Sequence, residues 1–224
     1  CMAVLGKEVP EVAVFDTAFH ATMPDYAYLY PVPYEFYEKY HIRRYGFHGT
    51  SHRYVTLRTA EVLGKRPEEL KLVTCHLGNG SSISAVDGGK CLDTTMGVTP
   101  LEGIMMGTRC GSIDPAIVPL IMKKENMTPD EVDYMMNKKS GILGVSQTTS
   151  DNRDIEMGAK AGNERYKLIE SMLCHQLTKY IGGFAAAMGG VDAIVFAGGI
   201  GENNPQYRTR VAEKLGSVSY THLT

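Results

Sequence analysis

The hydrophobic and polar positions divide the chain into two blocks, and the first block is rich in strands. Within it, one helix at 51–63 has apolar residues at helical spacing after a Thr50/Ser51 cap. The turn Asp87-Gly88-Gly89-Lys90 lies between two alternating segments and predicts a hairpin. Short apolar runs bounded by glycine or charged residues predict strands at 12–15, 70–77, 82–86 and 91–95.

From Asp114 onward the period of the apolar positions changes to that of helices. One more strand, 191–197, interrupts this second block and ends in Gly198-Gly199-Ile200-Gly201. The chain has no repeat and no low-complexity linker, and its 224 residues suffice for a hydrophobic core of its own. The pattern predicts an α/β or α+β fold with ligand chemistry at strand ends. The expected helices lie at 115–124, 129–137, 152–161, 163–188 and 205–215.

Composition narrows the class of protein. Twenty-three basic and 25 acidic residues give a net charge of −2, which argues against nucleic-acid binding by counterion release and against a polybasic membrane anchor. Five scattered cysteines without a C-x-x-C pair suit a reducing cytoplasm. The most apolar stretch, 181–201, contains Asp192 and many glycines, and the start of the chain lacks a signal-peptide pattern. We therefore expect a soluble cytoplasmic protein with no nucleic-acid or membrane partner.

Two glycine-rich turns follow buried strands, at 76–82 and 198–203. Glycines allow backbone N–H groups to converge on an anion, so each turn is a candidate phosphate site. The alternatives are an ordinary hairpin turn and a strand-to-helix turn. A Walker A motif is absent, and Gly199-x-Gly201 is followed by Asn204 where a dinucleotide fingerprint has its third glycine. Any nucleotide must therefore bind through another architecture.

Two histidines, His48 and His52, stand four apart around Gly49. A zincin pattern needs a helix and an intervening glutamate, whereas 45–48 is predicted to be a strand end and turn, so the pattern disfavours metal binding. His48 at a glycine-broken strand end suits hydrogen bonding to an oxyanion. The alternative is a half-buried histidine whose hydrogen bonds are satisfied internally.

Charged residues at element ends are further candidates. Arg109 lies between glycines ahead of a helix with Asp114 as its cap, and it either contacts phosphate or carboxylate oxygens or is a surface loop residue. Asp16, after the predicted strand 12–15, is a candidate metal–nucleotide ligand or base. Asp151 opens a helix, and a capping role accounts for it fully.

Six of these segments, in order and in spacing, resemble the acetate and butyrate kinase family. The resemblance runs from Val12 to Leu215. It implies that the chain contains part of the ribonuclease H-like α/β fold of the sugar kinase, Hsp70 and actin type. It implies three regions: residues 1–15 as the end of an N-terminal domain or an interdomain segment, 16–216 as a nucleotide-binding domain incomplete at its C-terminus, and 217–224 as a tail outside the family. The matching segments are 14–20, 43–52, 76–82, 106–115, 151–154 and 198–203.

The resemblance also implies an activity. It is the reversible transfer of a phosphoryl group from ATP to acetate or another short-chain carboxylate, with Mg²⁺ (or Mn²⁺), by a cytoplasmic homodimer. Asp16 would be the acid/base or the metal-orienting carboxylate, and His48 and Arg109 would stabilise the phosphoryl group in the transition state. Phe47 and Pro100 would form walls of the acetate pocket. The adenine nucleotide would contact His76, Leu77, Gly78, Asn79, Gly80, Asp151, Asn152, Arg153, Gly199, Ile200, Gly201, Glu202 and Asn203.

The chain departs from the family at its ends. An N-terminal phosphate loop, an arginine for the acetate carboxylate and a C-terminal acidic metal ligand are missing, so the metal ligands are expected in those missing parts. The tail from Ser217 resembles translated adapter sequence, and we expect the natural gene to continue differently after Leu215. Exposed sheet edges predict poor solubility. Three alternatives stay open: a propionate or butyrate kinase, a catalytically incomplete nucleotide-binding module and, least favoured, a dehydrogenase that uses Gly199-x-Gly201.

Overall fold

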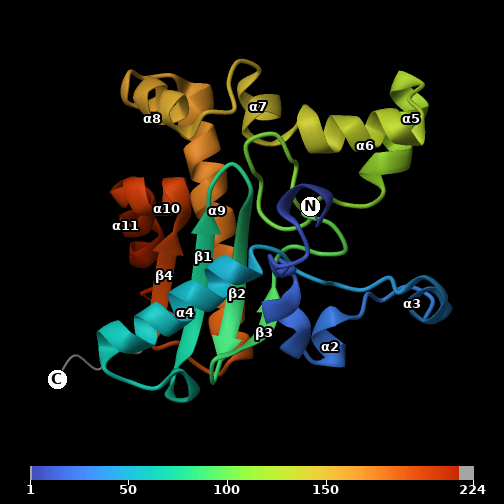
Figure 1. Cartoon of the computed structure of the whole chain (residues 1–224). Coiled ribbons are helices and arrows are strands. Elements are labelled where there is room, and N and C mark those ends of the chain that lie inside the picture. The colour runs from blue at the N-terminus through green and yellow to red at the C-terminus, as the bar shows by residue number, and fades with distance from the viewer. Residues whose placement is uncertain (1, 217–224) are drawn as a thin grey trace.

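A computed structural model describes residues 2–216, and its centre is a four-stranded mixed sheet (Figure 1). The strand order is β3-β2-β1-β4, in which β1, β2 and β3 are antiparallel neighbours and β4 runs parallel to β1. The expected α/β fold class is confirmed. The strands are β1 (Lys71–Leu77), β2 (Ser81–Asp87), β3 (Lys90–Thr94) and β4 (Ala193–Ala197).

The register brings the two glycine-rich segments, 78–80 and 198–203, to the same end of the strands. Leu77 pairs with Ser81, so the β1–β2 hairpin closes through 78–80. His76 pairs with Ala197 in the parallel β1–β4 pair, so both strands end side by side. The segments that follow them, at 78–80 and from Gly198, therefore lie next to each other, although more than a hundred residues separate them in the chain.

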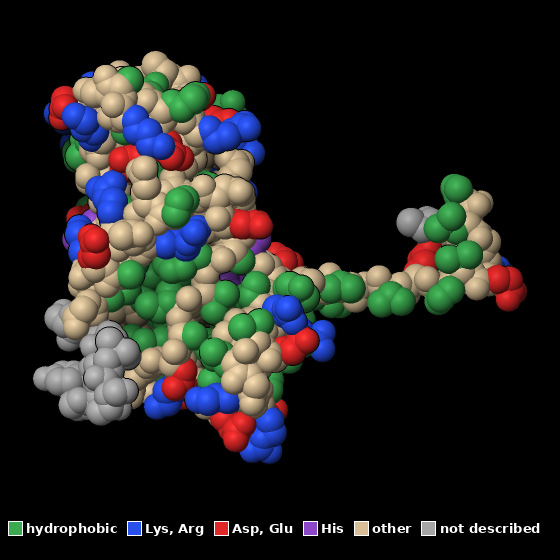
Figure 2. Space-filling view, turned by 90° about the vertical axis from the view of Figure 1, so that its left-hand side faces the viewer, with side chains coloured by type: hydrophobic (Ala, Val, Ile, Leu, Met, Phe, Trp, Pro, Cys, Tyr) green, Lys and Arg blue, Asp and Glu red, His purple; other side chains and the backbone are tan. Residues whose placement is uncertain are grey.

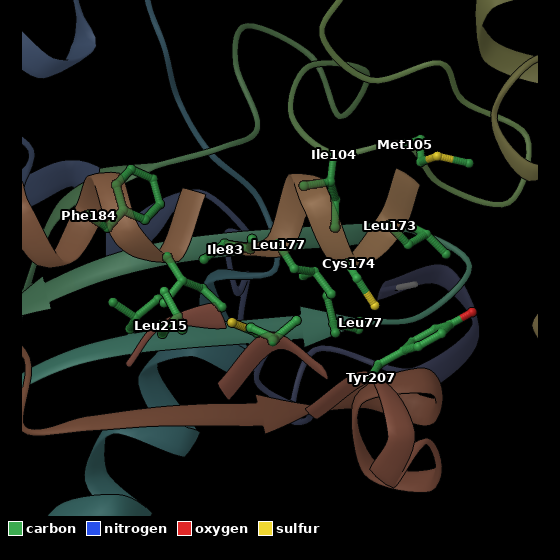
Figure 3. Packing of buried hydrophobic residues seen from close by; sticks show 14 of the residues in the cluster. Leu77, Ile83, Ile104, Met105, Leu173, Cys174, Leu177, Phe184, Tyr207 and Leu215 are labelled. Carbon is green, nitrogen blue, oxygen red and sulfur yellow. The ribbon is translucent and has the colours of Figure 1, made fainter. Parts of the chain in front are cut away.

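The two faces of the sheet differ in chemistry because side chains alternate along a strand. Val73, Cys75 and Leu77 of β1 belong to the main core together with residues of the 24-residue helix α9 (Glu164–Ala187) (Figure 3). Thr74 and His76 lie on the opposite face, which α4 (Gly49–Leu63) covers (Figure 1). One face is thus apolar and the other carries buried polar groups.

The remaining helices surround this sheet, and most expected helices are present within two residues of their predicted ends. The chain also forms short helices that the pattern does not predict, among them α7. Predicted and unpredicted together, the helical elements other than α4 and α9 are α1 (Met2–Leu5), η1 (Ala18–Thr22), α2 (Asp25–Tyr28), α3 (Glu35–Tyr40), η2 (Pro67–Glu69), α5 (Ile117–Glu125), α6 (Pro129–Lys138), α7 (Gly141–Ser146), α8 (Asn152–Lys160), α10 (Gly198–Asn203) and α11 (Pro205–Lys214).

The predicted strand at 12–15 is wrong. These residues form no part of the sheet, and Val12, Val14 and Phe15 are 81%, 75% and 69% exposed. Figure 2 shows the N-terminal segment as an arm that extends away from the body. A β-branched run forms a strand only where a neighbouring strand pairs with it, and none of the described strands does so here. Asp16 consequently does not end a strand.

The start of α4 also differs from expectation. Residues 45–48 form no strand end, and the helix begins at Gly49. His48 is the N-cap residue in a left-handed conformation (φ 59°), and neither Thr50 nor Ser51 has the capping role. Gly198–Asn203, expected as a turn, is the short helix α10.

The domain boundaries at 15/16 and 216/217 stay predictions, and the tail 217–224 lies outside the described residues. Within 2–216, no helix combines the length and apolar character needed to cross a membrane.

Candidate active site

A row of buried polar side chains links the polar face of the sheet to α4. His52, on the first turn of α4, places its Nδ1 2.8 Å from Thr74 Oγ1 and its Nε2 2.7 Å from Ser82 Oγ. Ser51 Oγ lies 2.8 Å from His76 Nδ1. The hydroxyls of Thr74 and Ser82 thus hold His52 in a defined orientation, and the Ser51 hydroxyl does the same for His76.

His48 lies at the outer end of this row. Its Nδ1 is 2.8 Å from Ser82 Oγ, and its ring stacks on that of His76 with centroids 4.2 Å apart. Its backbone N–H donates to Asp16 Oδ2 at 2.8 Å, and the N–H of Gly49 donates to the Asp16 carbonyl oxygen at 2.8 Å. Asp16 therefore fixes the backbone at the start of α4 and with it the position of the His48 ring.

Burial keeps the imidazoles of this site neutral. Desolvation, reinforced by the nearby His76 and Arg109, lowers the pKa of His48 to about 4, although Asp16 opposes the shift. Burial also lowers the pKa of His76 and takes the pKa of His52 well below its ordinary value. Near neutral pH these rings act as uncharged hydrogen-bond donors and acceptors.

Arg109 and His48 converge on Gly80. A Cβ atom built on Gly80 would lie 3.2 Å from Arg109 Nη1 and 3.4 Å from His48 Nε2. Arg109 Nη1 also donates to the Pro100 carbonyl oxygen at 3.4 Å. A guanidinium and an imidazole that share one point beside a glycine can both donate to a single anionic group there.

The loop that carries Arg109 is clamped by α7, a helix that sequence analysis missed. The N–H groups of Ile142 and Leu143 donate to the carbonyl oxygens of Met106 and Gly107 at 2.8 and 2.9 Å. Gly141 has φ 62°, and a side chain there would collide with the carbonyl oxygens of Met106 and Arg109. The Ser-Gly pair at 140–141 before an apolar run was the available signal for this helix start.

A cavity of about 740 Å³ lies beside this cluster, at the ends of β1 and β4. It brings together most residues predicted to contact a nucleotide. Asp151 is the N-cap of α8, as expected, and accepts from the Arg153 N–H at 2.8 Å. The Arg153 side chain, 2.6 Å away, lowers the pKa of Asp151 to about 2. The lining residues are Gly78, Asn79, Ser150, Asp151, Asn152, Arg153, Glu156, Gly199, Ile200, Asn203 and Asn204.

Five predicted nucleotide residues are not part of this lining. His76 and Gly80 lie on the His48 side of the turn, and Leu77 belongs to the core. Gly201 is buried against Phe196 and Leu77, while Glu202 is exposed and its carbonyl oxygen accepts from Arg208. These five residues shape the cavity through the backbone or lie next to it.

Three lining residues were missed: Ser150, Glu156 and Asn204. Asn204 caps α11 through the N–H of Tyr207 and places its Nδ2 3.4 Å from Glu156 Oε2. Each of the three has a sufficient local role as a cap, turn or helix-surface residue. Sequence alone therefore carried no ligand signal for them.

Phe47 and Pro100, predicted to line the substrate pocket, flank the two donors. Phe47 precedes His48, and its carbonyl oxygen accepts from His20 Nε2 at 2.9 Å. The loop that carries Pro100 is held by Arg44, which donates to the Thr94 carbonyl oxygen at 2.8 Å and pairs with Glu102 at 2.9 Å. Phe47 is thus next to His48 in the chain, and the Pro100 carbonyl oxygen contacts Arg109; their role as pocket walls stays a prediction.

In residues 2–216 no group of three histidine, cysteine or acidic side chains could hold a metal ion. The two histidines His48 and His52 are bridged by the Ser82 hydroxyl, and the expectation that they do not chelate zinc stays a prediction. Asp16 is exposed beside His48 and offers one carboxylate. A single carboxylate together with phosphate oxygens is a ligand set that Mg²⁺ accepts.

Comparisons with known proteins point to one family. A family model described as the acetokinase family matches residues 2–221. The acetate kinase of Halothermothrix orenii is 59% identical over 208 residues, which are 93% of this chain and 52% of that protein. The acetate kinase of Thermoanaerobacter pseudethanolicus is 60% identical over 213 residues, 95% and 53% of the two chains. The chain spans about half the length of the curated relatives it matches.

Solved structures give the same result. Porphyromonas gingivalis acetate kinase superposes with a TM-score of 0.87 at 50% identity and covers 88% of this chain and 50% of its own. A propionate kinase from Francisella tularensis gives a TM-score of 0.88 at 42% identity, with 92% and 53% coverage. The predicted fold, that of a partial ribonuclease H-like kinase, is confirmed, and the chain belongs to the acetokinase family.

Proposed function

We propose that the chain carries the nucleotide-binding and phosphoryl-transfer part of an acetate kinase, which converts ATP and acetate to ADP and acetyl phosphate and runs in both directions. The observation that carries this proposal is the convergence of Arg109 Nη1 and His48 Nε2 on Gly80, beside a cavity of about 740 Å³. That volume suits a nucleotide-sized ligand.

The nucleotide is assigned to the cavity at the ends of β1 and β4. Gly78 and Asn79 of the 78–80 turn line this cavity, and Gly80 of the same turn faces Arg109 and His48, so the terminal phosphate would lie near this turn. Asp151, Asn152 and Arg153 at the start of α8 would contact the nucleotide from one wall, and Gly199, Ile200 and Asn203 from another. Gly78 and Asn79 complete the lining, and His76, Leu77, Gly80, Gly201 and Glu202 would lie around the bound nucleotide.

In phosphoryl transfer the protein mainly positions the reactants and stabilises the charge of the transition state, and it has little covalent chemistry to perform. Arg109 would donate to the equatorial oxygens as a permanent cation, and His48 would donate as a neutral imidazole. Asp16 would orient the metal or accept a proton. A bound Mg²⁺ would neutralise phosphate charge, and Asp16 would offer it a carboxylate.

The acceptor is assigned as acetate or another short-chain carboxylate next to Phe47 and Pro100. A small apolar pocket discriminates by size at about 1–3 kcal/mol per methylene, so propionate would be a poorer substrate rather than an excluded one. The similarity to a propionate kinase structure keeps that acid as the second candidate. A homodimer in the cytoplasm is part of this proposal, and a nucleotide-binding module without catalysis is its alternative.

The test replaces the donors in an extended chain, in which the flanking segments of a curated acetate kinase are joined to residues 2–216. Arg109→Ala should lower kcat for acetyl phosphate formation by about 10²–10³. Arg58→Ala removes an exposed arginine of α4 that pairs with Glu61 and serves as the matched control. Equal activity of the two variants would show that Arg109 is not part of the site. Activity with propionate but not with acetate would show that propionate is the substrate.

A further inference from the structure

A continuous hydrogen-bond chain runs from the interior of the sheet to His48. It passes from Thr74 Oγ1 to His52 Nδ1 (2.8 Å), from His52 Nε2 to Ser82 Oγ (2.7 Å) and from Ser82 Oγ to His48 Nδ1 (2.8 Å). Thr74, His52 and Ser82 are fully buried. The chain ends at the one ring that lies beside Arg109 and Gly80.

Two directions give the Ser82 proton an acceptor. Each hydroxyl and each neutral imidazole carries one proton, and among the described residues the Ser82 hydroxyl contacts only the two imidazoles, so it donates to one ring and accepts from the other. In the outward direction, Thr74 donates to His52, His52 donates to Ser82 and Ser82 donates to His48 Nδ1. The proton of His48 is then on Nε2. In the inward direction every donor and acceptor exchanges roles, and the proton of His48 is on Nδ1.

The surroundings of Thr74 favour the outward direction. In the inward direction the Thr74 hydroxyl must donate to the Ser84 carbonyl oxygen, which is 3.5 Å away and at the limit of a hydrogen bond. In the outward direction it donates to His52 Nδ1 at 2.8 Å, and the protons of Thr74, His52 and Ser82 all have acceptors within the chain. A buried hydroxyl that donates over the shorter distance is the more stable arrangement.

We propose that Thr74, His52 and Ser82 are positioning residues that hold His48 in the neutral tautomer with its proton on Nε2, so that Nε2 donates to the anionic group at Gly80. The identity of that group as a phosphoryl group rests on the proposed function. The charged and titratable groups around His48 are His20, His76, Asp16 and Arg109. A neutral donor avoids repulsion with the Arg109 guanidinium, which an imidazolium would suffer.

The experiment reads the tautomer directly. The chain is labelled with ¹⁵N-histidine, and long-range ¹H–¹⁵N correlations at about pH 7.5, a pH at which neutral imidazole is the ordinary form, show which ring nitrogen carries a proton. The His48 signals are those lost in His48→Gln. We expect Nε2 of His48 to be protonated and Nδ1 to be bare.

Substitutions far from the ligand then test the relay. Thr74→Val removes the proton at the inner end without contact to His48 and should convert His48 to a mixture of tautomers, whereas Thr74→Ser should retain the wild-type tautomer. Ser82→Ala should abolish the preference as well. A wild-type His48 protonated on Nδ1 or on both nitrogens would overturn the proposal, and so would a Thr74→Val spectrum identical to the wild type.

The outcome is independent of the proposed function because no substrate is present. The predicted tautomer in a chain whose extended form makes no acyl phosphate would leave the relay intact and overturn the kinase assignment. An active extended chain with the opposite tautomer would support the kinase assignment and overturn the relay.

Discussion

At the scale of single residues, the site depends on Gly80 having no side chain. Arg109 Nη1 and His48 Nε2 lie 3.2 and 3.4 Å from the position of a Cβ there. Gly80 has no positive φ, so its backbone would accept alanine without strain. The glycine is therefore required by the site and not by the turn, which separates a functional from a structural role.

Gly80→Ala in the extended chain should reduce acetyl phosphate formation by about 10²–10³, because the methyl group displaces the anion from both donors. Its melting temperature should stay near that of the wild type. The matched control is Gly183→Ala within α9, where a Cβ meets nothing within 4 Å and should stabilise the helix by about 0.5–1 kcal/mol. Undiminished turnover in Gly80→Ala would contradict the assignment.

Burial of the histidines predicts the pH dependence of stability. The folded-state pKa values of His20, His48, His52 and His76 are all lowered, mainly by desolvation. The unfolded chain therefore binds protons that the folded chain does not, and the free energy of unfolding should fall as pH drops below about 6.5. Urea unfolding between about pH 7.5 and 5 measures this slope. His52→Asn should flatten the curve, and a slope that it leaves unchanged would show that this group contributes nothing.

At the scale of elements, regular secondary structure was predictable and its junctions were not. The strand at 70–77 and the long helix α9 follow from uninterrupted apolar patterns that bury their faces in one core. The arm at 12–15 carries the same kind of pattern without a paired strand, so the local signal misled. The short helix α7 is stabilised by hydrogen bonds to the 106–108 carbonyl groups, which no local pattern encodes.

The glycine at the start of α7 tests whether this helix positions the Arg109 loop. Gly141→Ala should lower the free energy of unfolding by about 1–3 kcal/mol more than Gly162→Ala, because both have positive φ but only Gly141 faces carbonyl oxygens of that loop. Chemical denaturation of the two variants gives the difference. Equal destabilisation would mean that backbone strain alone matters and that the loop is held elsewhere.

For the site, most residues that the resemblance assigned to the nucleotide line one cavity, and residues with a sufficient local role were missed. Asn79 belongs to a glycine-rich turn that was a candidate phosphate site, Asp151 was assigned to the nucleotide through the resemblance, and the structure places both at the cavity. Ser150, Glu156 and Asn204 were missed because their local roles gave no sign of a ligand. The convergence of Arg109 on Gly80 depends on long-range contacts that no spacing reveals.

At the scale of the whole molecule, two apolar features are open to solvent. The arm exposes Val12, Val14 and Phe15 (Figure 2). In addition, β4 pairs with no described strand other than β1. A hollow lined by Ile194, Phe196 and other apolar residues lies beside this edge. Unpaired edges and apolar patches promote association between copies.

We therefore expect the chain alone to self-associate as its concentration rises. Light scattering coupled to size-exclusion chromatography should show a mass that increases with loading. Val12→Lys with Phe15→Lys should reduce this mass, since both side chains lie on the exposed arm. A monodisperse wild-type chain at high concentration would contradict the expectation.

The most direct test of the central claim is acetyl phosphate formation from ATP, Mg²⁺ and acetate, measured for the chain alone and for the extended chain. The account predicts activity in the extended chain and little or none in the chain alone, because the chain spans about half the length of its curated relatives. An extended chain that binds ATP but makes no acyl phosphate from acetate or propionate would contradict it.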